Sequence, residues 1–452
     1  MRPLAAALAL AFPLALAAQP PAAATPAAPP AAAKPVALTP DQEKAVELFK
    51  AGKIDEAVVA LESAARANPK LPPARVTLSS LYFAAQNGQA ARMALEAVAS
   101  QDPKHPDVYL LNASYALGEG RLTDTVLSCQ VAIQLAADPR WDADQKKRFT
   151  REARIGLAAA FEQRKDWAAA RDQVTAVLAD DSKNAVVRQR LATCLFFLND
   201  PDRAFAELQT AYKDDPAAEL PELRMHQLAL MANDQPKAEE WLKKGIAAHP
   251  QSPRTQRAMA GWQLDQGNPE AAGGHLDAAI KLDPANRETG ILKGLMARYK
   301  KDFAAAEKVY EDLLREYPAD AVIAWNLSLV LAESGDAQKR RRAVDLAENE
   351  AKKNQRAPEA LAVYAWALYK SGRLDDSERA IGAATQLGAL TRDAAYIAGR
   401  ILADKNKPEV AVTALKAAVD GRGAFVYKAE ATALLADQQR KAPAAPPAAP
   451  KK

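Results

Sequence analysis

Apolar and polar residues alternate along most of the chain with the spacing of amphipathic helices. The stretch 287–318 is typical, because its apolar positions fall on two helical faces separated by the polar pair Lys301-Asp302: Ile291 and Leu295, then Phe303, Tyr310, Leu313 and Leu314. Apolar residues at i, i+3, i+4 and i+7 form one face of a helix. The pattern therefore predicts two antiparallel helices joined by a short turn, each with one buried face.

This helix pair recurs at a constant interval along the chain. Four successive prolines are evenly spaced: Pro216, Pro250, Pro284 and Pro318. The same interval separates Pro69 from Pro103. An alanine stands at one fixed distance before each of these prolines: Ala57, Ala91, Ala204, Ala238, Ala272 and Ala306. Proline lacks an N–H and disfavours helix in the residue before it, so each one ends a second helix. The small alanine lets two helices cross closely, and a fixed period of about 34 residues indicates stacked repeats.

The repeat resembles the tetratricopeptide repeat family. The matching features are a small residue at position 8, a large one near 11, a turn at 15, Ala at 20, a large apolar residue at 24, a small or apolar one at 27 and Pro at 32. Eleven copies start at residues 38, 72, 106, 151, 185, 219, 253, 287, 321, 358 and 392 and cover 38–423. The resemblance implies an all-α fold, an α-solenoid whose helix pairs stack into a right-handed superhelix with the first helices on the concave face.

The repeats are interrupted in a few places. Repeats 1–3 (38–136) and repeats 4–11 (151–423) are separated by an extended inter-repeat segment, 137–150, where we expect a lengthened pair of helices. Copy 9 has a few extra residues at 338–342, before its second helix, and copy 3 has Thr125 at the crossing position. Residues 424–438 (AFVYKAEATALLADQ) predict a lone capping helix that covers the last repeat.

The two ends of the chain differ from the repeats. Residues 1–18 place Arg2 before an apolar run that ends in Ala15-Leu16-Ala17, which is the pattern of a signal peptide. A membrane anchor is the alternative, but the run contains Pro13 and is shorter than the roughly 20 residues that span a bilayer. Residues 19–37 and 439–452 are rich in Pro and Ala and predict a linker and a disordered tail. We expect a periplasmic or secreted protein without membrane insertion of the mature chain.

Composition excludes several classes of function. The 452 residues include 60 basic and 56 acidic side chains, and this near balance gives no support for nucleic-acid binding. No phosphate-binding GxxxxGK[ST], HExxH or GxSxG motif occurs. Four different copies carry His105, His226, His249 and His275, so a shared metal is not expected, and Cys129 and Cys194 fall at apolar positions typical of buried thiols. The sequence predicts a protein that is not an enzyme and has no cofactor or metal.

The resemblance places ligand-facing residues at positions 2, 5, 6, 9, 12 and 13 of each copy. Two zones follow from those positions. Copies 5 to 7 present a basic stripe of Arg190, Arg224, Arg254 and Arg257, with Gln189 and Gln227 and the apolar Phe196, Phe197 and Leu230 among them. Copies 9 to 11 present an aromatic zone of Trp325, Asn326, Trp366, Tyr369, Tyr396 and Arg400.

Each zone has two interpretations. Guanidinium groups pair bidentately with carboxylates of a peptide, and ring faces suit apolar anchors or sugars. Alternatively, the rings pack between neighbouring copies and the arginines form a solvated, salt-bridged face that tolerates charge reversal. Asn326 resembles the groove asparagine that holds a peptide backbone in some family members, but the carboxylate clamp of three consecutive copies is not present. The basic run Lys339–Arg342 is a further candidate, with a solvated loop as its alternative.

The leading hypothesis is a non-enzymatic protein–protein interaction scaffold of the cell envelope, which binds a peptide or protein partner in its concave groove, within an envelope-assembly or secretion complex. One alternative is a helper that binds or assembles exported polysaccharide through the aromatic zone. Another is a regulatory arm of a separately encoded enzyme.

Overall fold

The computed structural model describes residues 39–68, 70–85 and 87–441, and the regular secondary structure in these ranges is helical throughout. The predicted signal peptide at 1–18, the linker at 19–37 and most of the predicted tail lie outside the described residues. The described chain forms two units, one ending at Asn233 and the other beginning at Asp234, and each is considered by itself. The boundary falls in the turn between the two helices of copy 6.

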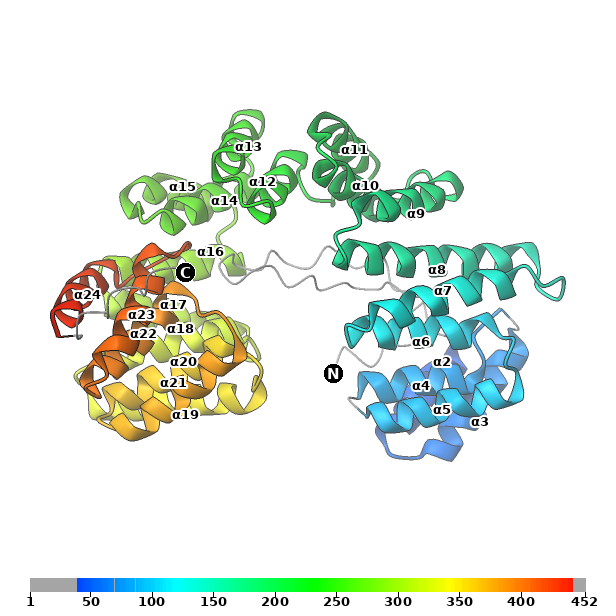
Figure 1. Cartoon of the computed structure of the whole chain (residues 1–452), viewed down its shortest axis with the longest axis horizontal. Coiled ribbons are helices and arrows are strands. Elements are labelled where there is room, and N and C mark those ends of the chain that lie inside the picture. The colour runs from blue at the N-terminus through cyan, green and yellow to red at the C-terminus, as the bar shows by residue number, and fades with distance from the viewer. Residues whose placement is uncertain (1–38, 69, 86, 442–452) are drawn as a thin grey trace, which may run out of the picture. The chain divides into compact units, whose positions relative to one another are not determined.

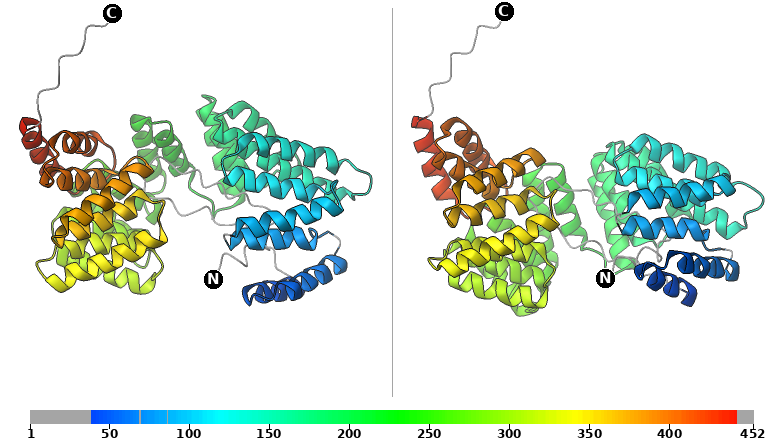
Figure 2. Two further views of the ribbon diagram at one scale, coloured as in Figure 1. Left: turned by 60° about the horizontal axis from the view of Figure 1, so that its bottom comes forward. Right: turned by 90° about the horizontal axis from the view of Figure 1, so that it is seen from below.

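The first unit contains the helices of copies 1 to 5 and the first helix of copy 6. They are α2 (Pro40–Lys50), α3 (Ile54–Ala67), α4 (Ala74–Ala84), α5 (Gly88–Gln101), α6 (Pro106–Gly118), α7 (Leu122–Ala136), α8 (Ala143–Gln163), α9 (Trp167–Asp180), α10 (Ala185–Phe197), α11 (Pro201–Asp214) and α12 (Pro221–Met231). Each helix packs against its sequence neighbours, as the views of this unit show (Figure 1, Figure 2).

The second unit contains the remaining helices. They are α13 (Gln235–Ala248), α14 (Pro253–Asp265), α15 (Pro269–Leu282), α16 (Arg287–Tyr299), α17 (Phe303–Glu316), α18 (Ala321–Ala332), α19 (Ala337–Lys353), α20 (Pro358–Lys370), α21 (Leu374–Leu387), α22 (Arg392–Asp404), α23 (Pro408–Asp420) and α24 (Lys428–Lys441). One continuous core runs from α16 to α24. The predicted all-α solenoid of paired helices is confirmed.

The small residues predicted at the helix crossings are buried. The six alanines at the crossing position are each 0% exposed: Ala57, Ala91, Ala204, Ala238, Ala272 and Ala306. Thr125 takes this position in copy 3, where its hydroxyl donates to the Arg121 carbonyl at 3.1 Å, so that the buried polar group keeps a partner. The crossing geometry therefore follows from side-chain size.

The turn between the two helices has one conformation in nearly every copy. Position 15 has a positive φ in nine copies, at Gly52, Gly120, Lys165, Asn199, Asn233, Gly267, Lys301, Gly372 and Asn406. Only glycine adopts this left-handed region without strain, and asparagine tolerates it better than other residues. Lys165 and Lys301 therefore carry backbone strain that the packing of the flanking helices must offset.

Surplus residues are absorbed by lengthening one helix of a pair. Between copies 3 and 4, α7 still ends at Ala136, but α8 has 21 residues and begins at Ala143 with Asp142 as its cap. The expected lengthening of both helices is therefore wrong for α7, which has 15 residues against 14 in most second helices. The extra turns of α8 are fixed by Arg148, whose guanidinium donates twice to the buried Asp107 carboxylate, at 2.9 and 3.0 Å.

Copy 9 and the C-terminus also differ from expectation. The extra residues 338–342 lie inside α19, which has 17 residues, and not before it. The C-terminal helix begins at Lys428 rather than at residue 424, and it extends to Lys441, inside the predicted tail. Residues 424–427 precede this helix, and the side chains of Phe425, Val426 and Tyr427 are buried in the second unit.

Candidate partner-binding groove

Three of the four arginines of the basic stripe are half-buried and hydrogen-bonded or ion-paired within the chain. On α10, the Arg190 Nε lies 3.0 Å from a carboxylate oxygen of Glu162. On α12, Arg224 donates to the Thr193 hydroxyl at 3.2 Å and to the Gln227 side-chain oxygen at 3.0 Å. Burial lowers the pKa of the Arg224 guanidinium. The expectation that Arg190 and Arg224 are solvated is therefore wrong, because both side chains are largely buried and hydrogen-bond to neighbours on the same and adjacent first helices.

The other two arginines of the stripe belong to the second unit. Arg257 on α14 is 17% exposed and lies 3.4 Å from the Asp283 carboxylate. Burial lowers the pKa of Arg257 as well. Arg254, one turn earlier on the same helix, is exposed. The predicted stripe is thus divided between two units, with one pair of arginines in each.

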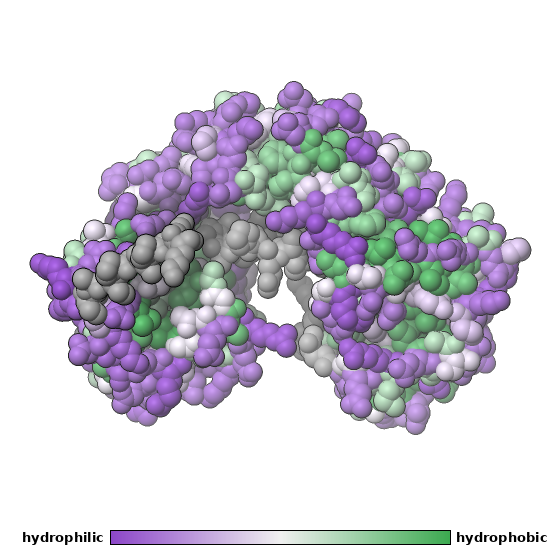
Figure 3. Space-filling view, in the orientation of Figure 1, coloured by the Kyte–Doolittle hydropathy of each residue, from purple (hydrophilic) through white to green (hydrophobic). Residues whose placement is uncertain are grey.

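Apolar groups beside the stripe are partly exposed in the first unit, where the hydropathy view shows apolar surface over several helices (Figure 3). The ring of Phe197 stacks on Trp167 with centroids 4.4 Å apart, and Phe196 meets Phe197 edge-on. Large apolar side chains with more than a third of their surface exposed include Phe83, Val186, Leu198 and Met231 in this unit. The first unit therefore presents apolar surface beside its two arginines.

Two rings of the aromatic zone in the second unit are buried. Trp366 on α20 is 3% exposed and Tyr396 on α22 is 6% exposed. Tyr369 stacks on Trp366 with centroids 5.2 Å apart, and its hydroxyl accepts from Arg400 Nε at 2.9 Å. In this conformation the faces of Trp366 and Tyr396 are covered, as the packing alternative expected.

Trp325 and Asn326 on α18 are committed to internal contacts as well. The Asn326 side-chain oxygen accepts from Arg298 at 2.9 Å, and its amide donates to the Val322 carbonyl at 2.9 Å. Trp325 packs on the core of the second unit, and its indole N–H is buried with no acceptor among the described residues. Asn326 therefore orients an arginine of the neighbouring copy, and both of its hydrogen-bonding groups are used.

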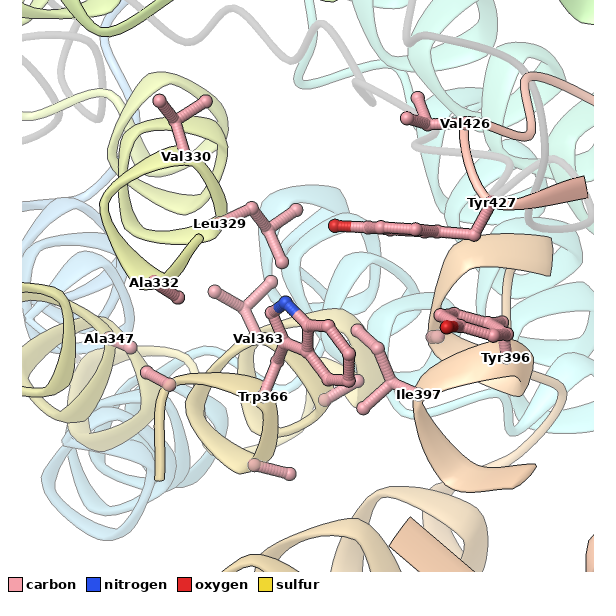
Figure 4. Close-up of a cluster of buried hydrophobic side chains, with 14 of the residues drawn as sticks. Leu329, Val330, Ala332, Ala347, Val363, Trp366, Tyr396, Ile397, Val426 and Tyr427 are labelled. Carbon is pink, nitrogen blue, oxygen red and sulfur yellow. The ribbon is translucent and has the colours of Figure 1, made fainter. Parts of the chain in front are cut away.

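The occupant of the groove is the chain's own segment 424–427. Phe425, Val426 and Tyr427 are 3%, 6% and 4% exposed. The Tyr427 ring stacks on Tyr396 with centroids 4.8 Å apart and planes inclined by 18°, and the Trp366 ring centroid lies 5.8 Å from that of Tyr427 (Figure 4). Tyr427 donates its hydroxyl to Glu333 Oε1 at 3.1 Å.

Backbone groups of the segment are bound by side chains from several copies. The N–H of Phe425 donates to the Tyr299 hydroxyl at 2.7 Å, and the N–H of Val426 donates to the Asp393 carboxylate at 3.2 Å. The Val426 carbonyl accepts from Lys301 Nζ at 3.3 Å. The segment is therefore held through its main chain as well as through its rings.

A buried ion pair crosses the groove beside this segment. Arg298 on α16 donates to Asp393 on α22 at 3.0 Å, and the side chains are 3% and 15% exposed. Burial opposes the charge on Arg298, but attraction to Asp393 outweighs it and raises the pKa of the guanidinium. Burial raises the pKa of Asp393. The pair joins copies 8 and 11, which are three repeats apart.

Sequence reasoning missed these residues, although a signal for them exists. Arg298 and Tyr299 occupy positions 12 and 13 of copy 8, Glu333 position 13 of copy 9, and Asp393 position 2 of copy 11. All are positions that face a ligand in the family.

The remaining candidates serve the fold. The basic run near the start of α19 pairs with acids on α17: Lys339 lies 2.8 Å from Glu307, and Arg342 pairs with Glu311. Cys129 and Cys194 are buried free thiols, and burial raises the pKa of each to about 12. Within the described ranges, no group of three His, Cys, Asp or Glu side chains is placed to hold a metal, and no helix has the length and hydropathy to cross a membrane.

Comparison with known families identifies the type of repeat. One profile described as tetratricopeptide repeat matches residues 48–115, and a second with the same description matches 260–321, 291–348 and 363–425. The chain contains tetratricopeptide repeats. Such repeats typically form non-catalytic scaffolds for protein–protein interaction. The search of curated proteins found no match.

Several solved structures are similar in fold. Yeast Tom70 matches at 15% identity over 89% of this chain and 95% of its own, with a TM-score of 0.34. A tetratricopeptide repeat protein of Thermus thermophilus matches at 13% identity over 42% and 100% of the two chains, with a TM-score of 0.36. The pilF protein of Pseudomonas aeruginosa matches at 18% identity over 47% and 95%, with a TM-score of 0.33. Similarities of this size give no argument about function.

Proposed function

We propose that the protein is a non-enzymatic scaffold of the cell envelope that binds a peptide or protein partner in the concave groove of its tetratricopeptide repeats. The observation that carries the proposal is that the groove of the second unit already holds a short non-helical peptide segment, residues 424–427. A surface that binds backbone N–H groups and aromatic side chains at the same time has the chemistry that a peptide partner requires.

The predicted signal peptide supports the envelope part of this proposal. The pattern at residues 1–18 predicts cleavage near Ala18, so the mature chain should begin near Gln19. Intact-mass analysis of the protein from its host tests this directly. A retained Met1 in the exported fraction, or a pool confined to the cytoplasm, would refute export.

The polysaccharide alternative receives less support. Sugar rings stack on exposed aromatic faces, whereas Trp366 and Tyr396 are packed against rings of the same chain. Glycan and peptide arrays probed with the full chain separate the two ligand classes. The third hypothesis, a regulatory arm of an enzyme, is a special case of protein binding and is tested by the identity of the partner.

Affinity capture from the envelope fraction is the most direct test of a protein partner. Arg400→Glu alters a side chain at the groove that is 39% exposed, and Arg315→Glu is a matched charge reversal on the second helix α17, where the side chain is 75% exposed. We expect wild type and Arg315→Glu to recover the same partner and Arg400→Glu to recover less of it. Equal recovery by all three chains, with folding intact, would place the binding surface elsewhere.

A further inference from the structure

The segment between α23 and α24 has the features of a bound ligand more than those of a repeat. It follows Gly421 and Gly423, and Gly423 has a φ of 95°, a conformation that favours glycine. A Cβ at Gly421 would lie 2.6 Å from the Ala417 carbonyl oxygen and 2.9 Å from Arg392 Cγ. These two glycines let the chain leave α23 and turn back into the groove.

Three successive N–H groups of the segment are bound by side chains from three different helices. Ala424 N–H donates to Asp265 at the end of α14, Phe425 N–H to Tyr299 at the end of α16, and Val426 N–H to Asp393 on α22. Groups that bind consecutive peptide N–H groups recognise the backbone irrespective of sequence. A peptide from another protein offers the same donors.

The two ring positions supply the sequence preference. The Arg392 guanidinium lies over the Phe425 ring, 4.6 Å from its centroid, and Lys301 Nζ lies 4.9 Å from the centroid of Tyr427. The Tyr427 hydroxyl reaches Glu333, whose side chain is 11% exposed and also accepts from Trp366 Nε1 at 2.9 Å. The side chain of Val426 is buried as well, so the site selects an aromatic residue, an apolar residue (x) at the middle position, and then tyrosine.

The helix that follows the segment is weakly attached. Of the 14 residues of α24, only Ala431 and Gln438 are buried. The ion pair that joins it to the turn after α16, Lys301 Nζ to Glu430 at 2.8 Å, involves side chains that are 42% and 43% exposed, and ion pairs this exposed contribute little to stability. Most of the attachment of the C-terminus therefore resides in residues 424–427 and in the contacts of α24 with α23.

From these contacts we infer that residues 424–427 are an internal competitor for the groove, and that the groove takes from a partner protein a peptide segment of the form Phe-x-Tyr once the chain's own segment has left. The inference rests on the proposed function and names the partner's chemistry and its regulation. When the binding-competent state is a minor population, the apparent affinity falls by the fraction that is open.

The test uses the full chain and a fluorescein-labelled peptide, Gly-Ala-Phe-Val-Tyr-Lys-Ala-Glu, which copies residues 423–430. Fluorescence anisotropy compares wild type with the double variant Phe425→Ala/Tyr427→Ala, which vacates both ring positions. Val410→Ala, at a side chain that is 55% exposed on α23, is the control. We expect the double variant to bind the peptide at least about 10-fold more tightly than wild type or the control, and a peptide with both aromatic residues replaced by alanine not to bind.

Hydrogen exchange on the wild-type protein keeps the inference testable if the double variant does not fold. A displaceable segment opens without global unfolding, so the amides of Phe425 and Val426 should exchange at least about 10-fold faster than interior amides of α20 and α22. Equal protection of these amides would show that the segment is an integral part of the core and would overturn the inference. Equal peptide binding by a folded double variant and wild type would overturn it as well.

The outcomes separate this inference from the proposed function. If affinity capture yields a partner but the peptide binds no better to the double variant, the scaffold function stands and the Phe-x-Tyr groove is wrong. If the peptide binds to the double variant but no partner is captured, the groove binds Phe-x-Tyr but serves only the chain's own terminus. That result would overturn the claim that the groove takes this segment from a partner protein.

Discussion

Two glycines in equivalent helices should respond in opposite ways to the same substitution. Gly294 is at position 8 of copy 8, inside α16, where a Cβ would lie 2.7 Å from Cε1 and from Cε2 of Tyr310. Tyr310 is 0% exposed and cannot move aside. Gly261 lies inside α14, and the nearest atom to its added Cβ is Leu292 Cδ2 at 3.9 Å.

The expected magnitudes follow from two opposing contributions. Replacing glycine by alanine inside a helix contributes about 0.5–1 kcal/mol of stability. Overpacking a filled core costs about 1–3 kcal/mol. Gly261→Ala should therefore stabilise the second unit by about 0.5–1 kcal/mol. At Gly294 the overpacking cost lies in the upper half of its range, about 2–3 kcal/mol, because Tyr310 is fully buried. Gly294→Ala should therefore destabilise the unit by about 1–2.5 kcal/mol after the helix gain is subtracted. For a unit of this size the difference corresponds to about 4–12 °C in melting temperature.

The assay must report on the second unit alone, because long repeat arrays can unfold in stages. Hydrogen exchange by mass spectrometry, on peptides from α14 to α17 at increasing urea concentration, gives a local midpoint for each variant. The reasoning fails if Gly294→Ala is as stable as wild type, or if both substitutions shift the midpoint in the same direction.

Three further predictions concern the groove and the basic stripe. Trp366→Phe removes the indole hydrogen bond to a largely buried carboxylate and should lower the free energy of unfolding by about 1–3 kcal/mol. Trp325→Phe removes an N–H that has no acceptor among the described residues and should cost clearly less in the same urea titration. Equal losses of stability in the two variants would contradict the hydrogen bond assigned to Trp366. Burial raises the pKa of Asp265 to about 7 from its ordinary value near 4, so the folded state binds more protons between about pH 4 and 7 and stability should fall as the pH rises through that window. Asp265→Asn keeps an acceptor for the backbone and should flatten that slope in denaturation midpoints measured at pH 5 and pH 8; an unchanged slope would assign it to other groups. Arg224→Glu places a carboxylate at a largely buried position near Glu162 and should destabilise the first unit by about 3 kcal/mol or more. An unchanged melting curve by circular dichroism would show that Arg224 is solvated.

The fold was predictable because repetition makes each weak signal recur. A single alanine upstream of a proline has little meaning, but Ala204, Ala238, Ala272 and Ala306 in phase define a helix crossing in four successive copies. The structure places all four at 0% exposure. The interruptions were harder to predict, since helix length at 137–150 depends on which polar partner Arg148 finds, and Asp107 is 41 residues away in sequence.

The groove was predictable only in part. Position in the repeat identified Trp366, Tyr369 and Tyr396 as concave residues, but it does not show what covers them. The sequence predicts a helix over 424–438, whereas the helix begins at Lys428. Gly421 and Gly423, followed by aromatic residues two apart, do not fit a helical period, and this was the available signal. Which surface the segment would fill depends on contacts between residues far apart in the sequence, such as Tyr427 with Glu333, which no local pattern contains.

The ion pair between Arg298 and Asp393 has a consequence for how this array can evolve. Repeat proteins ordinarily gain and lose whole copies, because each copy contacts only its neighbours and a new one fits between any two. In the second unit, Arg298 must meet Asp393 and Lys301 must meet Glu430. One additional or missing copy between these partners would move them out of register and leave a charge buried without its counterpart, which costs several kcal/mol. These long-range ion pairs thus fix how many copies lie between copy 8 and copy 11. Duplication or deletion of a copy should be tolerated only outside that interval.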